Sequence, residues 1–212
     1  MVLPAQAESH ACEPELLSAE ALMQWPAWGV GQRMLLPDQV LVEESEQSKG
    51  YMMVSPTSIA DHFTLSFETL ILSPATVLVV GLIGSSATGA ALFADDYDAN
   101  LPELTRGRPF MMIPFHNAAH NRPGAFIATF DDGQRRILDQ AYDFVTRVDT
   151  VHQIEFGKDE TQVWLDIDGE RLVSAPVEEV PQNTHLMLRL RGTGFREAAA
   201  LFRNVELNQC DH

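Results

Sequence analysis

Basic residues are scarce in this sequence, and their scarcity limits what the protein can bind. Lysine and arginine together number 14, against 30 aspartates and glutamates, so the formal net charge is −16. A surface of that sign repels phosphate backbones and anionic lipid headgroups, and we therefore expect no nucleic-acid partner. The charge names no ligand by itself, because a merely solubilising surface has the same composition.

Cysteine is almost absent, and the two that occur, Cys12 and Cys210, lie near opposite ends of the chain. They either form one disulfide between neighbouring terminal strands or remain two free thiols. In the chain-entropy model, a bridge that closes so long a loop stabilises the fold by on the order of 4 to 5 kcal/mol. Residues 1–7 end in Ala5-Gln6-Ala7, which resembles the end of a signal peptide. We therefore expect a periplasmic or secreted protein with a flexible segment at 1–14.

Charge is missing altogether between residues 69 and 94, a span long enough to cross a bilayer as a helix. Turn-forming residues interrupt it, namely Ser73-Pro74, Gly81 and a glycine-serine cluster from Gly84, so its apolar runs are short. We expect no transmembrane segment here. Two buried strands, at 75–83 and 89–94, explain the composition better.

Repeats, low-complexity tracts and linkers are also lacking, so we expect a single domain over residues 1–212. Hydrophobic residues make up 45% and charged residues 21% of the chain, a balance typical of globular proteins. Between turn signals, strand patterns recur at short spacing, which favours an all-β fold. In the strand that begins at Phe63, the side chains of Phe63, Leu65 and Phe67 alternate with polar ones, so one face is core. Further strands are expected at 51–55, 109–115, 125–130, 151–156, 162–167, 171–175, 185–191 and 201–207. Short helices are expected at 15–24 and 133–142, and the alanines within 196–202 make helix an alternative there.

Three segments in the last third of the chain are informative together. They are a strand beginning with His at 152–156 (HQIEF), an aromatic strand ending in Asp-Gly at 164–169 (WLDIDG), and a last strand at 201–205 (LFRNV). The combination resembles the concanavalin A-like lectin/glucanase superfamily, in particular its bacterial laminin-G-like and 3-keto-disaccharide-hydrolase-like branches. The resemblance implies a jelly-roll sandwich of two antiparallel sheets with few short helices. Lectins, glycosidases, lyases and adhesion modules all share that fold, so it does not decide the function.

The paired carboxylates of the glucanase branch, in a Glu-x-Asp-x-x-Glu strand, are lacking. The carboxylates nearest to that pattern, Asp168 and Glu170, flank Gly169 in a position where Asp-Gly forms a tight turn. We interpret this segment as a structural hairpin. Enzymatic activity is left open by the sequence; if present, it would be that of a glycoside hydrolase or a polysaccharide lyase.

A polar loop after the strand at 109–115 is the first candidate site. Arg108 precedes the strand, and His116, Asn117 and His120 follow it. Histidine titrates near neutrality, so His116 or His120 is a candidate acid or base on a sugar, with Arg108 and Asn117 as substrate-binding groups. An ordinary solvated hairpin loop is the alternative.

A second candidate is metal binding by Asp96, Asp98 and Asn100, which alternate as the first ligands of a calcium loop do. Leu101 and Gly107 stand where an EF-hand requires glycine and glutamate, so an EF-hand is excluded. Either a calcium site of another geometry or an ordinary acidic loop explains the pattern. No cofactor is required by any other feature.

A third candidate is a sheet face. If Val163, Leu165 and Ile167 point into the core, Trp164 and Asp166 lie on the outer surface. The same logic exposes further side chains on flanking strands: Gln153, Glu155, Met187, Arg189 and Arg191. An aromatic ring beside charged and amide groups is typical of a carbohydrate-binding groove, which gives Gln153, Trp164, Arg189 and Arg191 as binding residues and Glu155 and Asp166 as catalytic ones. Trp25 and Trp28 form either a second stacking platform or part of the core.

These observations predict an exported protein that binds, and in one version cleaves, an oligo- or polysaccharide in the concave groove of a β-sandwich. The alternative is a non-catalytic adhesion or structural domain whose partner is another protein.

Overall fold

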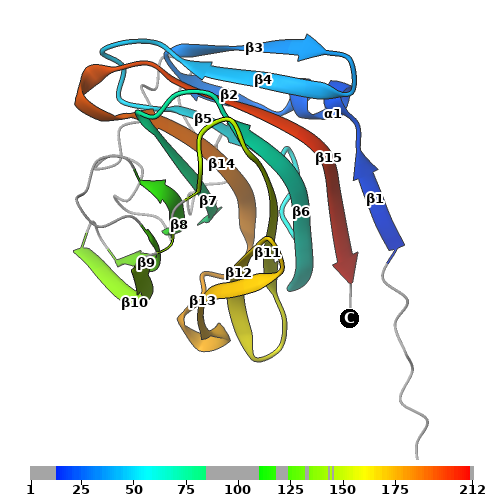
Figure 1. Cartoon of the computed structure of the whole chain (residues 1–212). Helices are drawn as coiled ribbons and strands as arrows, with labels where there is room; N and C mark the ends of the chain where they lie inside the picture. The colour runs from blue at the N-terminus through cyan, green and yellow to red at the C-terminus, as the bar shows by residue number, and fades with distance from the viewer. Residues whose placement is uncertain are drawn as a thin grey trace, which may run out of the picture.

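The computed structural model describes residues 13–84, 110–117, 124–131, 134–142, 144 and 146–210. For residues 13, 14, 110, 116, 117, 131 and 195 it describes the backbone alone. The described strands form two antiparallel sheets packed face to face, with one short α-helix, so the predicted all-β two-sheet sandwich is confirmed (Figure 1).

Sheet A contains eight strands in the order β13-β12-β11-β6-β15-β4-β3, and β1 pairs with β15 beside β4. Its strands are β1 (Glu13–Leu17), β3 (Gly31–Leu36), β4 (Gln39–Glu44), β6 (His62–Ile71), β11 (Val151–Lys158), β12 (Gln162–Ile167), β13 (Glu170–Pro176) and β15 (Ala198–Cys210). Both terminal parts of the described chain, β1 and β15, therefore lie next to each other in this sheet.

Sheet B contains seven strands in the order β10-β9-β8-β7-β14-β5-β2. Its strands are β2 (Ala27–Gly29), β5 (Tyr51–Val54), β7 (Thr76–Gly84), β8 (Phe110–Asn117), β9 (Gly124–Asp131), β10 (Gln134–Tyr142) and β14 (Thr184–Gly192). Two 3₁₀ turns, Val177–Glu179 and Thr193–Phe195, lie before and after β14. In Figure 1, β14 lies inside the arc that β6 and β15 describe, so the free face of sheet B is on the inside of the curve.

The main core fills the space between the sheets. Alternation places Phe63, Leu65 and Phe67 of β6 in it, as predicted, opposite Leu78 and Val80 of β7. Phe63 packs edge-to-face on Phe156 with ring centroids 5.3 Å apart. The predicted core residues of β12 are likewise buried.

Helix α1 (Ala19–Gln24) closes one end of this core. The Ser18 hydroxyl accepts a hydrogen bond from the Ala21 N–H and caps the helix. Leu22 and Trp25 are buried, and Arg33 of β3 donates to both of their carbonyl groups, at 2.9 and 2.7 Å. Trp25 thus belongs to the core and not to a stacking platform.

Several local predictions are corrected. Residues 134–142 form strand β10 and not a helix, and they pair with β9 at the edge of sheet B. The helix expected at 15–24 is shorter, because β1 extends to Leu17. The segment that contains the three alanines is strand β15. Glu13 and Pro14, expected to be flexible, belong to β1, whereas residues 1–12 and the strand expected at 89–94 lie outside the described residues.

Cys210 is disulfide-bonded, and Cys12, the other cysteine of the sequence, lies outside the described residues. Within the described part of the chain, no helix reaches the length and hydropathy that a membrane span requires. The uncharged segment that raised this question is largely accounted for, up to Gly84, by β6, a turn and β7.

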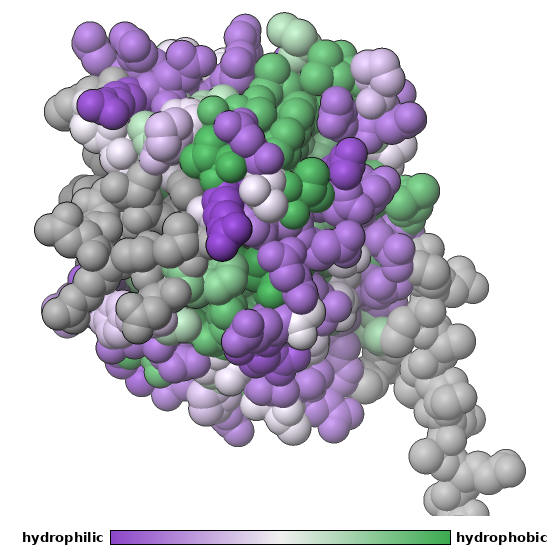
Figure 2. Space-filling model, in the orientation of Figure 1, coloured by the Kyte–Doolittle hydropathy of each residue, from purple (hydrophilic) through white to green (hydrophobic). Residues whose placement is uncertain are grey.

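The outer face of sheet A is mostly polar, but one row of aliphatic residues crosses it. Cα pairing joins five residues on five neighbouring strands: Val151, Leu70, Leu201, Leu41 and Met34. Val151 and Met34, at the two ends of this aliphatic row, are 41% and 46% exposed. Figure 2 shows apolar surface in its upper part, in the region where Figure 1 places β3 and β4.

Candidate functional site

The free face of sheet B carries a second apolar cluster. Because neighbouring residues of a strand point to opposite sides, the residues between those of the main core gather on this face. Its buried members are Met52, Val54, Val79, Ile83, Met112, Ala128 and Met187, and Trp28, Val77, Phe126 and Phe130 pack against them partly exposed. We call this surface the inner face of sheet B, since it lies inside the curve of the sandwich (Figure 1).

One arginine stands in the middle of this apolar surface. Cα pairing places Arg189 in a row with Trp28, Met52 and Val79, on four neighbouring strands. Arg189 is 5% exposed, and its Nη2 donates to the Lys49 carbonyl at 2.7 Å. The guanidinium packs on the loop before β5 at Gly50, whose φ is +134°, so that a Cβ there would collide with it.

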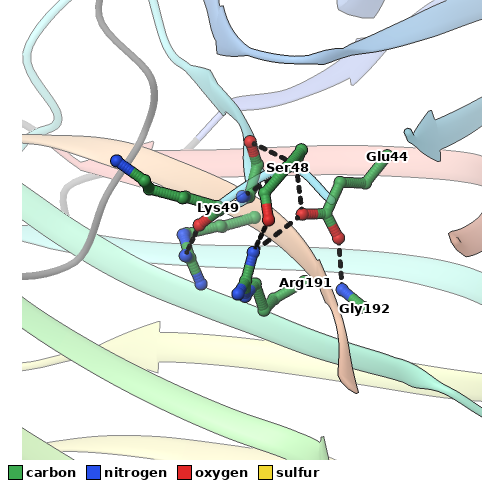
Figure 3. A network of polar contacts seen from close by, with 7 residues as sticks. Glu44, Ser48, Lys49, Arg191 and Gly192 are labelled. Atoms are coloured by element: carbon green, nitrogen blue, oxygen red, sulfur yellow. Dashed lines mark hydrogen bonds and ion pairs between the residues drawn. The ribbon is translucent and has the colours of Figure 1, made fainter. Parts of the chain in front are cut away.

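A buried carboxylate supports the neighbouring arginine, as Figure 3 shows. Glu44, at the end of β4, accepts hydrogen bonds from the Ser48 hydroxyl and the Gly192 N–H, and from Arg191 at 3.3 Å. Arg191 also donates to the Ser48 carbonyl. We call these four residues the Glu44 network. It joins the end of a strand of sheet A to the end of β14 and fixes the loop between β4 and β5.

Strand β8 brings part of the predicted loop site to the same sheet. Val77 of β7 pairs with Asn117 on one side and with Arg191 on the other, so these two residues lie two strands apart, about 10 Å. His116 is the preceding residue of β8. The side chains of His116 and Asn117 lie outside the described residues, as do Arg108 and His120 entirely, so their roles stay predictions.

The calcium prediction cannot be placed on the structure, because Asp96, Asp98 and Asn100 lie outside the described residues. Among the residues that are described, no three histidine, cysteine or acidic side chains gather as metal ligands would.

The face around Trp164 has a different arrangement from the predicted groove. Trp164 and Asp166 point out of sheet A beside Glu155, as expected. Arg189 and Arg191, however, lie on β14 in sheet B, so the expected common face does not exist. The predicted exposure of Met187 and Arg189 is also wrong, since both are buried.

The side chain of Trp164 is almost completely covered by its neighbours. Its indole is 9% exposed, the Arg171 guanidinium lies 4.7 Å from its centroid, and Gly157 lies so close that a Cβ would collide with the ring. Its Nε1 donates to Glu155 at 3.2 Å, and Asp166 binds Arg171 through both carboxylate oxygens. These groups satisfy one another, and the ring offers little surface for stacking a sugar.

Two residues of the motifs that resemble the superfamily, His152 and Asp168, are hydrogen-bonded to each other near Trp164. His152 is buried, with Nδ1 2.8 Å from Asp168 and Nε2 accepting from the Arg147 N–H at 2.9 Å. Because Nε2 accepts, Nδ1 carries the hydrogen and donates to Asp168. Asp168 has a positive φ of 54° at the hairpin turn, and its other oxygen accepts from the Gln153 N–H. The His motif and the Asp-Gly motif thus contact each other and fix the hairpin turn between β12 and β13 against the start of β11.

Glu68 of β6 is the centre of a second cluster on this face. It accepts hydrogen bonds from Arg203 at 2.5 Å, Asn204 at 3.1 Å and the side chain of Gln153 at 3.2 Å. The hydrogen bond from Asn204, followed by that from Arg203, lowers the pKa of Glu68. Gln153, predicted to bind substrate, is therefore bound to a neighbouring side chain.

Sequence reasoning missed Glu44, Ser48 and Glu68. The apolar run Val40-Leu41-Val42 would have predicted β4, and the two-residue period of a strand places Glu44 on the same buried side as Val42, but it does not name the partners of Glu44. Two of those partners, Arg191 and Gly192, come from a strand almost 150 positions later in the chain.

Comparison with solved structures supports the architecture. A Bacillus subtilis protein of unknown function with a galectin-like fold superposes with a TM-score of 0.76 at 13% identity, covering 95% of this chain and 98% of that one. The fold is the concanavalin A-like jelly roll. The jelly-roll fold that the sequence resemblance implies is confirmed.

Two further concanavalin A-like structures are similar. The carbohydrate-binding module CBM66 from Bacillus subtilis has a TM-score of 0.55 at 11% identity, covering 87% of this chain and 95% of that one. The κ-carrageenase of Pseudoalteromonas carrageenovora, in complex with a κ-carrageenan oligotetrasaccharide, has a TM-score of 0.61 at 6% identity and covers 99% of each chain. No protein-family model and no curated protein sequence matches this chain. At these identities the comparisons establish the fold alone.

Proposed function

We propose that the protein recognises an oligo- or polysaccharide on the inner face of sheet B. The observation that carries the proposal is the composition of that face: an apolar floor, partly exposed aromatic side chains and two fixed arginines. Ligand sites commonly combine an apolar lining with a few well-placed polar groups. A sugar ring stacks its C–H face on an aromatic ring, while its hydroxyls accept hydrogen bonds from arginine.

The roles within this face follow from exposure. The methionines and Arg189 are buried and hold the floor in shape, whereas Trp28, Phe126 and Phe130 are partly exposed. Arg191, whose side chain is 28% exposed, is held by Glu44 at the end of the face. A glycan on the inner face therefore contacts the aromatic side chains and Arg191 first. Arg108, Asn117, His116 and His120 remain proposed participants, the two histidines as acid or base if a reaction takes place.

Glu155 and Asp166 do not belong to the proposed site. Both lie on sheet A, where Trp164 donates to one oxygen of Glu155 and Arg171 donates to both oxygens of Asp166. Of the four residues predicted as catalytic, Glu155 and Asp166 lie on sheet A and His116 on sheet B, and His120 lies outside the described residues. Binding without turnover is therefore the form of the proposal that the described residues support best. The Cys210 disulfide favours an oxidising location, so a periplasmic or secreted protein remains part of the proposal.

A binding and turnover assay with matched variants tests this function. The protein is titrated with plant, algal and bacterial polysaccharides by affinity electrophoresis and calorimetry, and released sugars are sought by chromatography. We expect at least one ligand whose affinity falls tenfold or more in Trp28→Ala, since stacking on one aromatic ring contributes about 0.5–1.5 kcal/mol beyond its buried area.

Trp164→Phe is the control, because its indole lies closed on the other sheet. Equal losses in the two variants, or no binding to any polysaccharide, would overturn the proposal. Product release would instead show a reaction and direct mutagenesis to His116 and His120.

The aliphatic row on sheet A supports a second candidate, a module that docks on another protein. Exposed Val151 and Met34 at its two ends leave apolar surface in water on an otherwise polar sheet. If this is the function, the parent protein binds no glycan but captures a protein partner. The Met34→Thr variant then loses that capture. Retention of a partner by the Met34→Thr variant would rule out this role for the row.

A further inference from the structure

A gap in sheet A opens a pocket beside β15. On the side of β15 away from β6, strand β4 pairs up to Arg203, and β1 pairs from Val205 onward. Asn204 lies between them without a pairing partner in either strand, in a left-handed conformation with φ 50°. The pairing of β15 with β6 also shifts register between Arg203 and Glu206. A β-bulge and an interrupted neighbour therefore leave a notch in the sheet.

The notch is an open pocket of about 240 Å³. Its accessible apolar lining comes from Leu16, which is 72% exposed, and from Leu17, whereas the lining residues Leu22 and Phe202 are buried in the core. That volume lies below the roughly 300–1,000 Å³ of sites for drug-sized ligands. It suits one ring of a small molecule, with the flat apolar side of the ring against Leu16 and Leu17.

Polar groups from three separate elements line the same notch. Glu20 comes from the first turn of α1, Asp38 from the turn between β3 and β4, and Arg203 and Asn204 from β15. The two carboxylates are hydrogen-bond acceptors, whereas the guanidinium supplies donors. Two negative charges against one positive charge disfavour an anionic ligand.

Glu68, on β6 across β15 from the notch, binds the side chains of two residues that line the notch. It binds Arg203 at 2.5 Å and Asn204 at 3.1 Å, and its own side chain is 17% exposed. Because one carboxylate fixes both neighbours, their positions are set before any ligand arrives. Such preorganisation reduces the entropy lost on binding. Glu68 is thus a positioning residue for the notch.

We propose that the notch binds a single uncharged sugar unit. Vicinal hydroxyls of the sugar donate to Glu20 and Asp38, Arg203 donates to a sugar oxygen, and the C–H face of the ring lies on the apolar lining. The ligand class rests on the proposed function, but the notch lies on sheet A, away from the inner face of sheet B. It is therefore a second and independent sugar site, suited to a chain end or a branch.

Titration of ¹⁵N-labelled protein tests the notch directly. The probes are the methyl glycosides of glucose, galactose, mannose and rhamnose, with methyl glucuronoside as the anionic comparison. We expect at least one neutral glycoside to shift the amide signals of Glu20, Asp38 and Asn204, and the glucuronoside to bind at least tenfold more weakly. Asp38→Asn removes a charged acceptor yet tolerates the positive φ of 58° at this position, and should weaken binding about tenfold or more. Glu178→Gln, at the 3₁₀ turn before β14, is the control and should change nothing.

The Glu68→Gln variant provides a second test of binding at the notch. It leaves the notch lining intact but loosens Arg203 and Asn204, so we expect weaker binding at unchanged ligand preference. No shift at the notch with any neutral glycoside, or equal affinity in the Asp38→Asn and parent proteins, would overturn the inference. Amide-signal shifts confined to residues of sheet B would also contradict sugar binding in the notch, but they would agree with the proposed function. Loss of polysaccharide binding in Trp28→Ala, with notch shifts retained, would separate the two sites.

Discussion

Replacement of Glu44 by glutamine should destabilise the fold strongly, although the two side chains have the same shape. Glu44 is 1% exposed and serves as acceptor for Ser48, Arg191 and the Gly192 N–H in the network of Figure 3. A glutamine keeps one oxygen and places an NH₂ group where the other oxygen was. That group faces a donor, so at least one hydrogen bond is lost.

The magnitude follows from the burial of the partners. An unsatisfied buried donor costs about 1–3 kcal/mol. Breaking a fully buried ion pair costs roughly 3–5 kcal/mol, but Arg191 is partly exposed and recovers water, so the charge contributes less here. We expect Glu44→Gln to lower the free energy of unfolding by about 2–4 kcal/mol, an estimate built from these two effects.

Urea denaturation followed by tryptophan fluorescence measures this loss. Glu43→Gln is the matched control, because Glu43 is the preceding residue of the same strand, faces the opposite side and bonds Gln32 at the surface. It should change stability by less than about 0.5 kcal/mol. The double variant with Arg191→Met should lose less than the sum of the single losses, since both changes remove the same contact. If Glu44→Gln and Glu43→Gln have equal effects, or if the losses add fully, the network does not stabilise the fold as described.

Three further changes probe other contacts. Gly157→Ala should lower stability by about 1–3 kcal/mol, because the new methyl group collides with Trp164; an unchanged urea midpoint would contradict the close packing. Hydrogen bonds from Asn204 and then Arg203 lower the pKa of Glu68 below its unfolded value, so its stabilisation is complete above the ordinary glutamate pKa and is lost as pH falls through the folded value. In the Glu68→Gln variant, the free energy of unfolding should therefore fall less steeply as the pH is lowered than in the parent protein. Equal slopes for the two proteins at acidic pH would refute this. Reduction of the Cys210 disulfide should lower the free energy of unfolding by on the order of 4 to 5 kcal/mol, measured with and without reductant.

The strands with strict alternation could be predicted from the sequence. The pattern of Phe63, Leu65 and Phe67 identified β6 and its core face, and the Asp-Gly turn identified the hairpin of β12 and β13. The sequence of strand β10, QRRILDQAY, is rich in helix formers and therefore predicts a helix, which the structure does not have. As an edge strand with mostly exposed residues, it is specified by pairing with β9 and not by its own pattern.

The candidate sites depended more on tertiary structure. Trp164 and Asp166 do face outward, but only the fold places Arg171 over the indole and Gly157 beneath it. The side of sheet B on which Arg189 lies follows from alternation, yet its burial follows from the packing of a distant loop at Lys49 and Gly50. No local pattern contains that information.

Composition and alternation by themselves determined that this chain is an acidic β-sandwich, which strand residues face the core, and which turns are tight, because these properties depend on neighbours within a few positions. Tertiary structure alone decided that β14 joins sheet B, that Glu44 meets Gly192, and that the gap between β4 and β1 opens a notch beside Asn204. The physical reason is that sheet order and register are set by contacts between segments far apart in the chain. A shift in either one exchanges every pair of partners.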